Sequence, residues 1–73
     1  MNALEIKAAR ARLGYRQRHM ANYLGISVPA YNRKENGKAR FSDHEKVELA
    51  KLLGFSLVQT NDYLYDGILP IEK

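Results

Sequence analysis

The chain has 73 residues, of which 45% are hydrophobic and none is cysteine, and its formal net charge is +4. The composition excludes a disordered chain, disulfide bonds and thiolate metal sites, and no apolar run reaches the roughly 20 residues of a membrane span. Since the N-terminus also lacks the pattern of a signal peptide, we expect one intracellular domain over residues 1–73, near the lower size limit for a single apolar core.

Glycines divide the chain into segments of helical length without strand alternation: Gly14, Gly25, Gly37, Gly54 and Gly67. The first helix is predicted to start at Asn2, a good N-cap residue with Glu5 three positions further on, and to end by Leu13. Its inner face should carry apolar residues spaced three and four apart, namely Ile6, Ala9 and Leu13.

The second predicted helix covers residues 17–24 and buries three side chains, those of Met20, Ala21 and Leu24. The third covers about residues 27–36, with Ser27 as its N-cap and Pro29 tolerated in its first turn. Only residues 25–26 separate the two helices. A helix, a short turn with a glycine and a second short helix form the helix-turn-helix pattern.

The fourth predicted helix begins at Ser42, where Glu45 completes a capping box, and it buries Val47, Ala50 and Leu53. The fifth begins at Ser56, where Gln59 completes a second capping box, and it turns three side chains inward, those of Leu57, Tyr63 and Leu64. Five short helices with tight connections predict an all-α bundle.

Charge is distributed unevenly along the chain. Residues 1–40 hold nine Lys/Arg and two Glu, a net charge of +7, whereas residues 41–73 hold three Lys and six carboxylates, a net charge of −3. A basic half joined to an acidic half is typical of a protein that binds a polyanion. The alternative, a surface charged for solubility, does not account for the asymmetry.

The third predicted helix has an unusual outward face. If Ala30 and Tyr31 point to the core, the residues that point outward are Val28, Pro29, Asn32 and Arg33. Arg33 can donate two hydrogen bonds to guanine, Asn32 can pair with adenine, and the apolar pair can contact the methyl group of thymine. The alternatives are a solvated cation at Arg33, a polar residue at Asn32 that needs no partner, and local packing of Val28 on Pro29.

Many residues match one known family in identity and spacing: Leu13-Gly14, Gln17, Met20-Ala21, Leu24-Gly25-Ile26-Ser27, Tyr31 and Glu35-Asn36-Gly37-Lys38. On these residues the chain resembles the XRE, or Cro/CI, helix-turn-helix family over about residues 4–65. The resemblance implies a five-helix lambda-repressor-like domain that binds DNA. The chain length resembles that of a small phage Cro-like regulator or modulator of repression.

The resemblance also implies roles for individual residues. The recognition-helix positions that approach bases or adjacent phosphates are Ser27, Val28, Pro29, Asn32 and Arg33. Gln17 matches a residue that contacts the DNA backbone and braces the recognition helix, and the loop residues that match phosphate contacts are Asn36, Lys38 and Arg40. Arg10 and Glu35 match an internal ion pair found in some members. The side chains able to neutralise phosphates on chemical grounds alone are Arg16, Arg18, Lys38 and Arg40.

The chain departs from the family pattern at several positions. Arg16 stands where a capping Asn, Ser or Thr is common, and Lys34 replaces a residue that is usually apolar. Val28 and Pro29 stand where many relatives place polar base-reading residues. These differences leave the predicted fold unchanged and leave the preferred DNA sequence open.

No sequence pattern predicts an enzyme, a cofactor or a metal site. His19 and His44 fall on different predicted helices, without metal-ligand spacing and without a cysteine partner. Gly37-Lys38 lacks the upstream glycine and the following Ser or Thr of a phosphate-binding loop. We therefore expect a binding protein without a cofactor.

The expected partner is an operator in double-stranded DNA, in the cytoplasm or nucleoid of a bacterial host and within a phage or prophage switch. The alternative is a modulator that uses the same fold to bind a partner repressor protein. The basic residues Lys38 and Arg40 favour DNA, because a purely protein-binding surface has no need of them.

The C-terminal tail, residues 68–73, carries large apolar residues after the last glycine. We hypothesise that a homodimer or a complex with a partner repressor uses a surface made of Tyr65, Ile68, Leu69 and Ile71. Docking of the tail onto the first and fifth helices of its own chain is an equally open alternative.

Overall fold

The fold is seen in a computed structural model that describes residues 1–67. Over these residues the chain forms α-helices and no strands: α1 (Ala3–Arg12), α2 (Gln17–Leu24), α3 (Val28–Glu35), α4 (Asp43–Leu53) and α5 (Leu57–Leu64). The prediction of an all-α fold with five helices is confirmed. Among residues 1–67, no helix combines the length and the apolar character that a membrane crossing requires.

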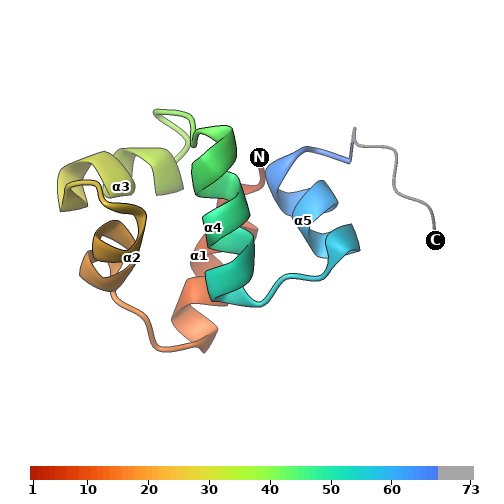
Figure 1. The fold of residues 1–73 in the computed structure, drawn as a ribbon, viewed down its shortest axis with the longest axis horizontal. Coiled ribbons are helices and arrows are strands. Elements are labelled where there is room, and N and C mark those ends of the chain that lie inside the picture. Colours follow the sequence, from red (N-terminus) through yellow and green to blue (C-terminus); the bar gives the residue numbers. More distant parts are fainter. Residues whose placement is uncertain (68–73) are drawn as a thin grey trace.

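Two helices, α2 and α3, pack against each other at one end of the molecule. In the view of Figure 1, α1 and α4 lie in the middle, with α2 and α3 on one side and α5 on the other. The helix α2 packs against α3 and α4, and α1 contacts both α3 and α5. The α2–α3 pair therefore packs on α1 and α4 with one side, and among residues 1–67 no other helix packs extensively against its other side.

Side-chain caps fix where most of the helices begin. The side chain of Asn2 accepts a hydrogen bond from the Glu5 N–H, and that of Ser27 accepts one from the Ala30 N–H. Reciprocal capping boxes open α4 and α5, formed by the predicted pairs Ser42–Glu45 and Ser56–Gln59. Because each cap pairs N–H groups that the helix itself cannot pair, the local sequence sets these boundaries.

The core is a single cluster to which every helix contributes. Its buried apolar residues are Ile6, Ala9, Met20, Ala21, Tyr31, Phe41, Leu49, Leu53 and Leu64. Seven of the positions predicted to face inward are in this cluster: Ile6, Ala9, Met20, Ala21, Tyr31, Leu53 and Leu64. Three others, Leu24, Ala50 and Tyr63, are only partly buried and pack against its edge.

Three residues predicted to face inward are exposed: Leu13 by 48%, Val47 by 45% and Leu57 by 78%. Leu13 follows the last residue of α1, where the chain turns away from the core. On α4 the buried stripe passes through Leu49 and Leu53, which places Val47 on the opposite side. Leu57 opens α5, and the preceding Phe55 packs against the cluster instead.

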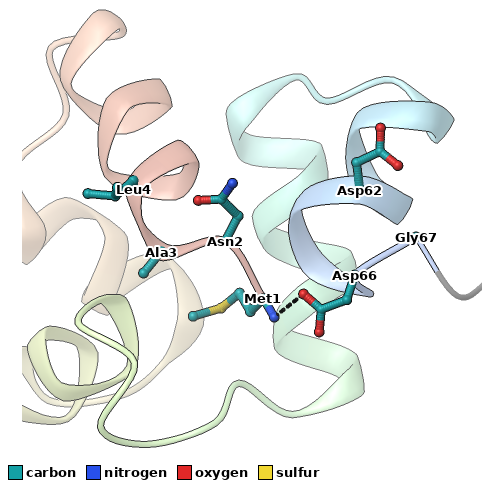
Figure 2. Close-up of a pocket in the computed structure, with 7 residues that line it drawn as sticks. All are labelled: Met1, Asn2, Ala3, Leu4, Asp62, Asp66 and Gly67. Carbon is teal, nitrogen blue, oxygen red and sulfur yellow. Dashed lines mark hydrogen bonds and ion pairs between the residues drawn. The ribbon is translucent and has the colours of Figure 1, made fainter.

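The start of α1 is fastened to the end of α5. The Asn2 N–H donates to the Tyr63 carbonyl at 2.7 Å, and the N-terminal ammonium group of Met1 pairs with the Asp66 carboxylate (Figure 2). A shallow hollow of about 500 Å³ beside this ion pair is lined by residues of both segments. These contacts close the bundle at the end opposite to α2 and α3.

The difference between predicted and observed core on α4 gives a direct test. Leu49→Ala removes a completely buried side chain and should lower the free energy of unfolding by about 2–5 kcal/mol. Val47→Ala, on the exposed side of the same helix, should change it by no more than about 0.5 kcal/mol. Chemical denaturation of both variants measures this, and equal losses would contradict the observed orientation of α4.

Candidate nucleic-acid interface

The turn between α2 and α3 sets the angle at which α3 is presented. Gly25 ends α2 in a left-handed conformation with φ 71°, where a side chain would strain the backbone. The Ile26 N–H then donates to the Ala21 carbonyl at 3.0 Å, and Ser27 caps α3. Ala21 is completely buried, and its small side chain allows the two helices to approach closely.

One side of α3 faces the core and the other faces solvent. Tyr31 and Glu35, four residues apart, are completely buried. The residues predicted to form the base-reading face are all exposed, namely Ser27, Val28, Pro29, Asn32 and Arg33. The structure therefore gives these residues a common outward face, and their contact with bases stays a prediction.

The buried carboxylate of Glu35 joins three helices. It accepts hydrogen bonds from Arg10 of α1 (Nε at 2.8 Å and Nη2 at 3.1 Å), from Gln17 of α2 (Nε2 at 3.2 Å) and from the Tyr31 hydroxyl (2.6 Å). The Arg10–Glu35 ion pair implied by the family resemblance is thus present. Arg10 also donates to the Tyr15 carbonyl, so the guanidinium group fixes the loop before α2.

These hydrogen bonds, together with burial, determine the protonation states of Glu35, Arg10 and Tyr31, the Glu35 cluster. Burial raises the pKa of Glu35, but the hydrogen bonds from Arg10, Tyr31 and Gln17 outweigh burial and hold that pKa below its ordinary value. The hydrogen bond to Glu35 raises the pKa of Arg10, and burial raises the pKa of Tyr31. The cluster is therefore an ionised Glu35–Arg10 pair with a neutral phenol.

Hydrogen bonds continue from Glu35 to the outward face through side-chain amides. Gln17 Oε1 accepts from Asn32 Nδ2 at 3.3 Å, and Asn32 Oδ1 accepts from Asn36 Nδ2 at 3.3 Å. Asn36 Oδ1 in turn accepts from Lys7 Nζ at 3.3 Å. This row of hydrogen-bonded side chains is not evident from the sequence, because its members come from three helices and the turn after α3, and only the fold brings them together.

A second ion pair explains the unusual residue Lys34. Its Nζ lies 2.6 Å and 2.8 Å from the two carboxylate oxygens of Glu45, the residue that completes the Ser42 capping box. Burial raises the pKa of Glu45, and hydrogen bonds from Lys34 and Ser42 outweigh it and hold the pKa below its ordinary value. Lys34 therefore ties α3 to the start of α4 and does not point to solvent as a free cation.

The other charged residues predicted to contact DNA are exposed and form no ion pair within residues 1–67. Among residues 1–67, no carboxylate forms an ion pair with Arg16, Arg18, Arg33, Lys38 or Arg40. Arg16 is the N-cap residue of α2 and Arg18 lies in its first turn, and the Arg16 side chain does not cap the first N–H groups of the helix. Such N–H groups together with positive charges attract phosphate oxygens.

A hollow of about 480 Å³ lies beside the first turn of α2. It is lined by Gly14, Tyr15, Arg16, Arg18, His19 and Asn22. Two of these lining residues, Tyr15 and His19, have ring centroids 4.5 Å apart. His19, which lacks metal-ligand spacing in the sequence, therefore makes a ring contact with Tyr15 that its sequence position did not predict.

The predicted protein interface is only partly within the described residues. Ile68, Leu69 and Ile71 lie outside residues 1–67. Tyr65 is partly buried, packs against the core cluster and carries the ammonium group of Lys46 at 4.7 Å from its ring centroid. In residues 1–67, no group of three or more potential metal ligands comes together.

The chain is similar to one known protein family. The chain matches the helix-turn-helix family model over residues 6–59, more than half of its length. Neither a curated protein nor a solved structure gave a significant match. The matched range includes all of α2, the turn and α3, together with most of α1 and all of α4.

The Arg10–Glu35 pair should show strong energetic coupling. Arg10→Met or Glu35→Leu alone leaves a buried charge without its partner, and each should destabilise the fold more than the double variant does. We expect a coupling energy of about 0.5–3 kcal/mol in a double-mutant cycle. Chemical denaturation of the wild type, the two single variants and the double variant measures this energy. A value of zero would show that the pair does not stabilise the fold.

Acidification should weaken the fold through the same carboxylates. Because the pKa of Glu35 and of Glu45 is lower in the folded chain than the ordinary 4.5, their stabilisation is complete above that value and is lost as the pH falls through the folded pKa. Unfolding measured from pH 7 to pH 3 should show less acid destabilisation in Glu35→Gln and Glu45→Gln than in the wild type. Asp62→Asn, at an exposed carboxylate, is the control and should follow the wild type.

Proposed function

Because the chain belongs to the XRE-type helix-turn-helix family of DNA-binding transcription regulators, we propose that it binds a specific operator in double-stranded DNA and represses transcription. In this proposal α3 lies in the major groove, and the protein occupies the operator and blocks access of the polymerase. The regulator acts in the cytoplasm of a bacterial host, as a Cro-like part of a phage or prophage switch, and needs no cofactor.

The proposal rests on one observation: α3 has an exposed face, and the cations at the start of α2 and after α3 form no ion pair within residues 1–67. Asn32 and Arg33 are exposed on this face, Arg16 and Arg18 lie at the start of α2, and Lys38 follows α3. A recognition helix flanked by phosphate-binding groups has the layout needed to dock on a duplex.

Each kind of contact then has a separate task. Arg33 donates to guanine O6 and N7, and the apolar pair Val28 and Pro29 contacts the methyl group of thymine. The cations and the N–H groups at the start of α2 contact phosphates, which gives affinity without sequence information. Ser27 and Asn36, at the two ends of α3, provide polar groups that contact the adjacent DNA backbone.

The arrangement of charge favours DNA over a partner repressor as the main ligand. Lys34 and Arg10 form internal ion pairs, whereas Lys38 and Arg40 form none in the part of the chain that the structure describes. Free cations beside the recognition helix contribute to phosphate binding and add little to an apolar protein contact. Two copies of the chain on neighbouring half-sites are the arrangement we propose on the operator.

Selection from a library of random duplexes, followed by titration at two salt concentrations, tests this function. A regulator of this kind should select one sequence, and its affinity for that duplex and for unrelated duplexes should fall as salt rises. Binding to no duplex, or equal binding to every sequence, would contradict the proposal.

Alanine substitutions of Arg33 and Lys38 should weaken binding to the selected duplex in different ways. Arg33→Ala should cost about 1–3 kcal/mol and relax the preference at one base pair, because it removes a bidentate contact to guanine. Lys38→Ala should weaken binding to all sequences similarly and reduce the salt slope by about one unit. Fluorescence anisotropy on matched and mismatched duplexes measures both, and wild-type binding by Arg33→Ala would show that α3 reads DNA with other residues.

A further inference from the structure

The chain of side-chain amides between Glu35 and Lys7 has two ends of opposite hydrogen-bonding character. Glu35 is an ionised carboxylate and can only accept, whereas the Lys7 ammonium group can only donate. The three residues between them, Gln17, Asn32 and Asn36, each have one donor end and one acceptor end.

The two ends therefore fix the direction of every amide between them. Gln17 must turn its NH₂ group to Glu35, so its oxygen faces Asn32. Asn32 must then turn its NH₂ group to Gln17, and its oxygen accepts from Asn36. The last oxygen, on Asn36, meets the Lys7 ammonium group. No amide can be rotated by 180° without facing two donors or two acceptors toward each other.

This direction decides what Asn32 offers to a base. After its bonds to Gln17 and Asn36, the side chain keeps one N–H on Nδ2 and one lone pair on Oδ1, and the residue is exposed. A neighbouring donor and acceptor match adenine, which presents N7 as acceptor and N6–H as donor in the major groove. Guanine presents two acceptors, so the Asn32 oxygen would face O6 without a proton between them.

We propose that Lys7 and Asn36 are positioning residues that hold the Asn32 amide in the orientation that selects adenine over guanine. The proposal rests on the function proposed above, since it assigns one base pair of the same operator. Lys7 lies on α1, outside the recognition helix, and contributes through the direction that its ammonium group imposes.

The substitution Lys7→Glu tests this role, because it replaces a group that only donates by one that only accepts. Asn36 then turns its NH₂ group to the new carboxylate and its oxygen to Asn32. Asn32 cannot satisfy both Asn36 and Gln17 from one orientation, so its amide is no longer fixed. Arg12→Glu is the matched control, because it makes the same change of charge at an exposed position of α1 outside the amide chain.

A measurement without DNA tests the amide chain itself. In ¹⁵N spectra of the free protein, Lys7→Glu should shift the side-chain NH₂ signals of Asn36, Asn32 and Gln17, while Arg12→Glu should leave them in place. The thermal midpoint should be similar in the two variants. Unchanged NH₂ signals in Lys7→Glu would overturn the amide chain and would leave the proposed function untouched.

A measurement with DNA tests the selectivity. On the duplex selected by the wild type, Asn32→Ala identifies the base pair at which a preference is lost. At that pair the wild type should bind adenine over guanine by about fivefold to 150-fold, the range expected of one bidentate contact. Lys7→Glu should lose most of this ratio, whereas Arg12→Glu should weaken both duplexes and keep it.

The outcomes separate the two proposals. If Lys7→Glu keeps the adenine ratio of the wild type, or if Asn32→Ala changes no base preference while the wild type still selects a sequence, the positioning role is wrong and the regulator function stands. If the wild type selects no sequence at all, the proposed function fails, and the assignment of adenine to Asn32 fails with it.

Discussion

The Glu35 carboxylate is the group on which the rest of this small structure depends. A buried carboxylate is costly unless it is paired and hydrogen-bonded, and here its partners are drawn from three helices: Arg10 of α1, Gln17 of α2 and Tyr31 of α3. Satisfying one charge therefore fixes the relative positions of these helices. The outward face of α3 is presented at one angle because its inward face is held in this way.

The basic residues of the first half of the chain divide into two sets with different tasks. Arg10 and Lys34 neutralise buried carboxylates and hold α3 to α1 and to α4. Arg16, Arg18, Arg33, Lys38 and Arg40 stay exposed and without an ion pair in residues 1–67. The same excess of positive charge that the sequence shows thus contributes both to the architecture and to the surface on which the proposed duplex docks.

Local signals in the sequence predicted the helices well, and the reasons are physical. Both residues of a cap such as Ser42–Glu45 lie within four positions of each other, so the interaction can be predicted from the local sequence alone. The residues that face the core were harder to predict. On α4, either Val47 or Leu49 could belong to the buried face, and only packing against the other helices decides between them. The Lys34–Glu45 pair and the amides that join Gln17 to Lys7 could not be predicted from spacing, since the fold alone brings these residues together.

The central claim is that a duplex docks on the face of α3 that the Glu35 cluster holds in place. Titration of the ¹⁵N-labelled chain with its selected duplex, followed residue by residue in NMR spectra, tests this claim most directly. The account predicts the largest changes at Asn32, Arg33 and Lys38 and in the first turn of α2, with the buried Tyr31 and Glu35 keeping their contacts. Changes confined to α4 and α5, with none on α3, would contradict it.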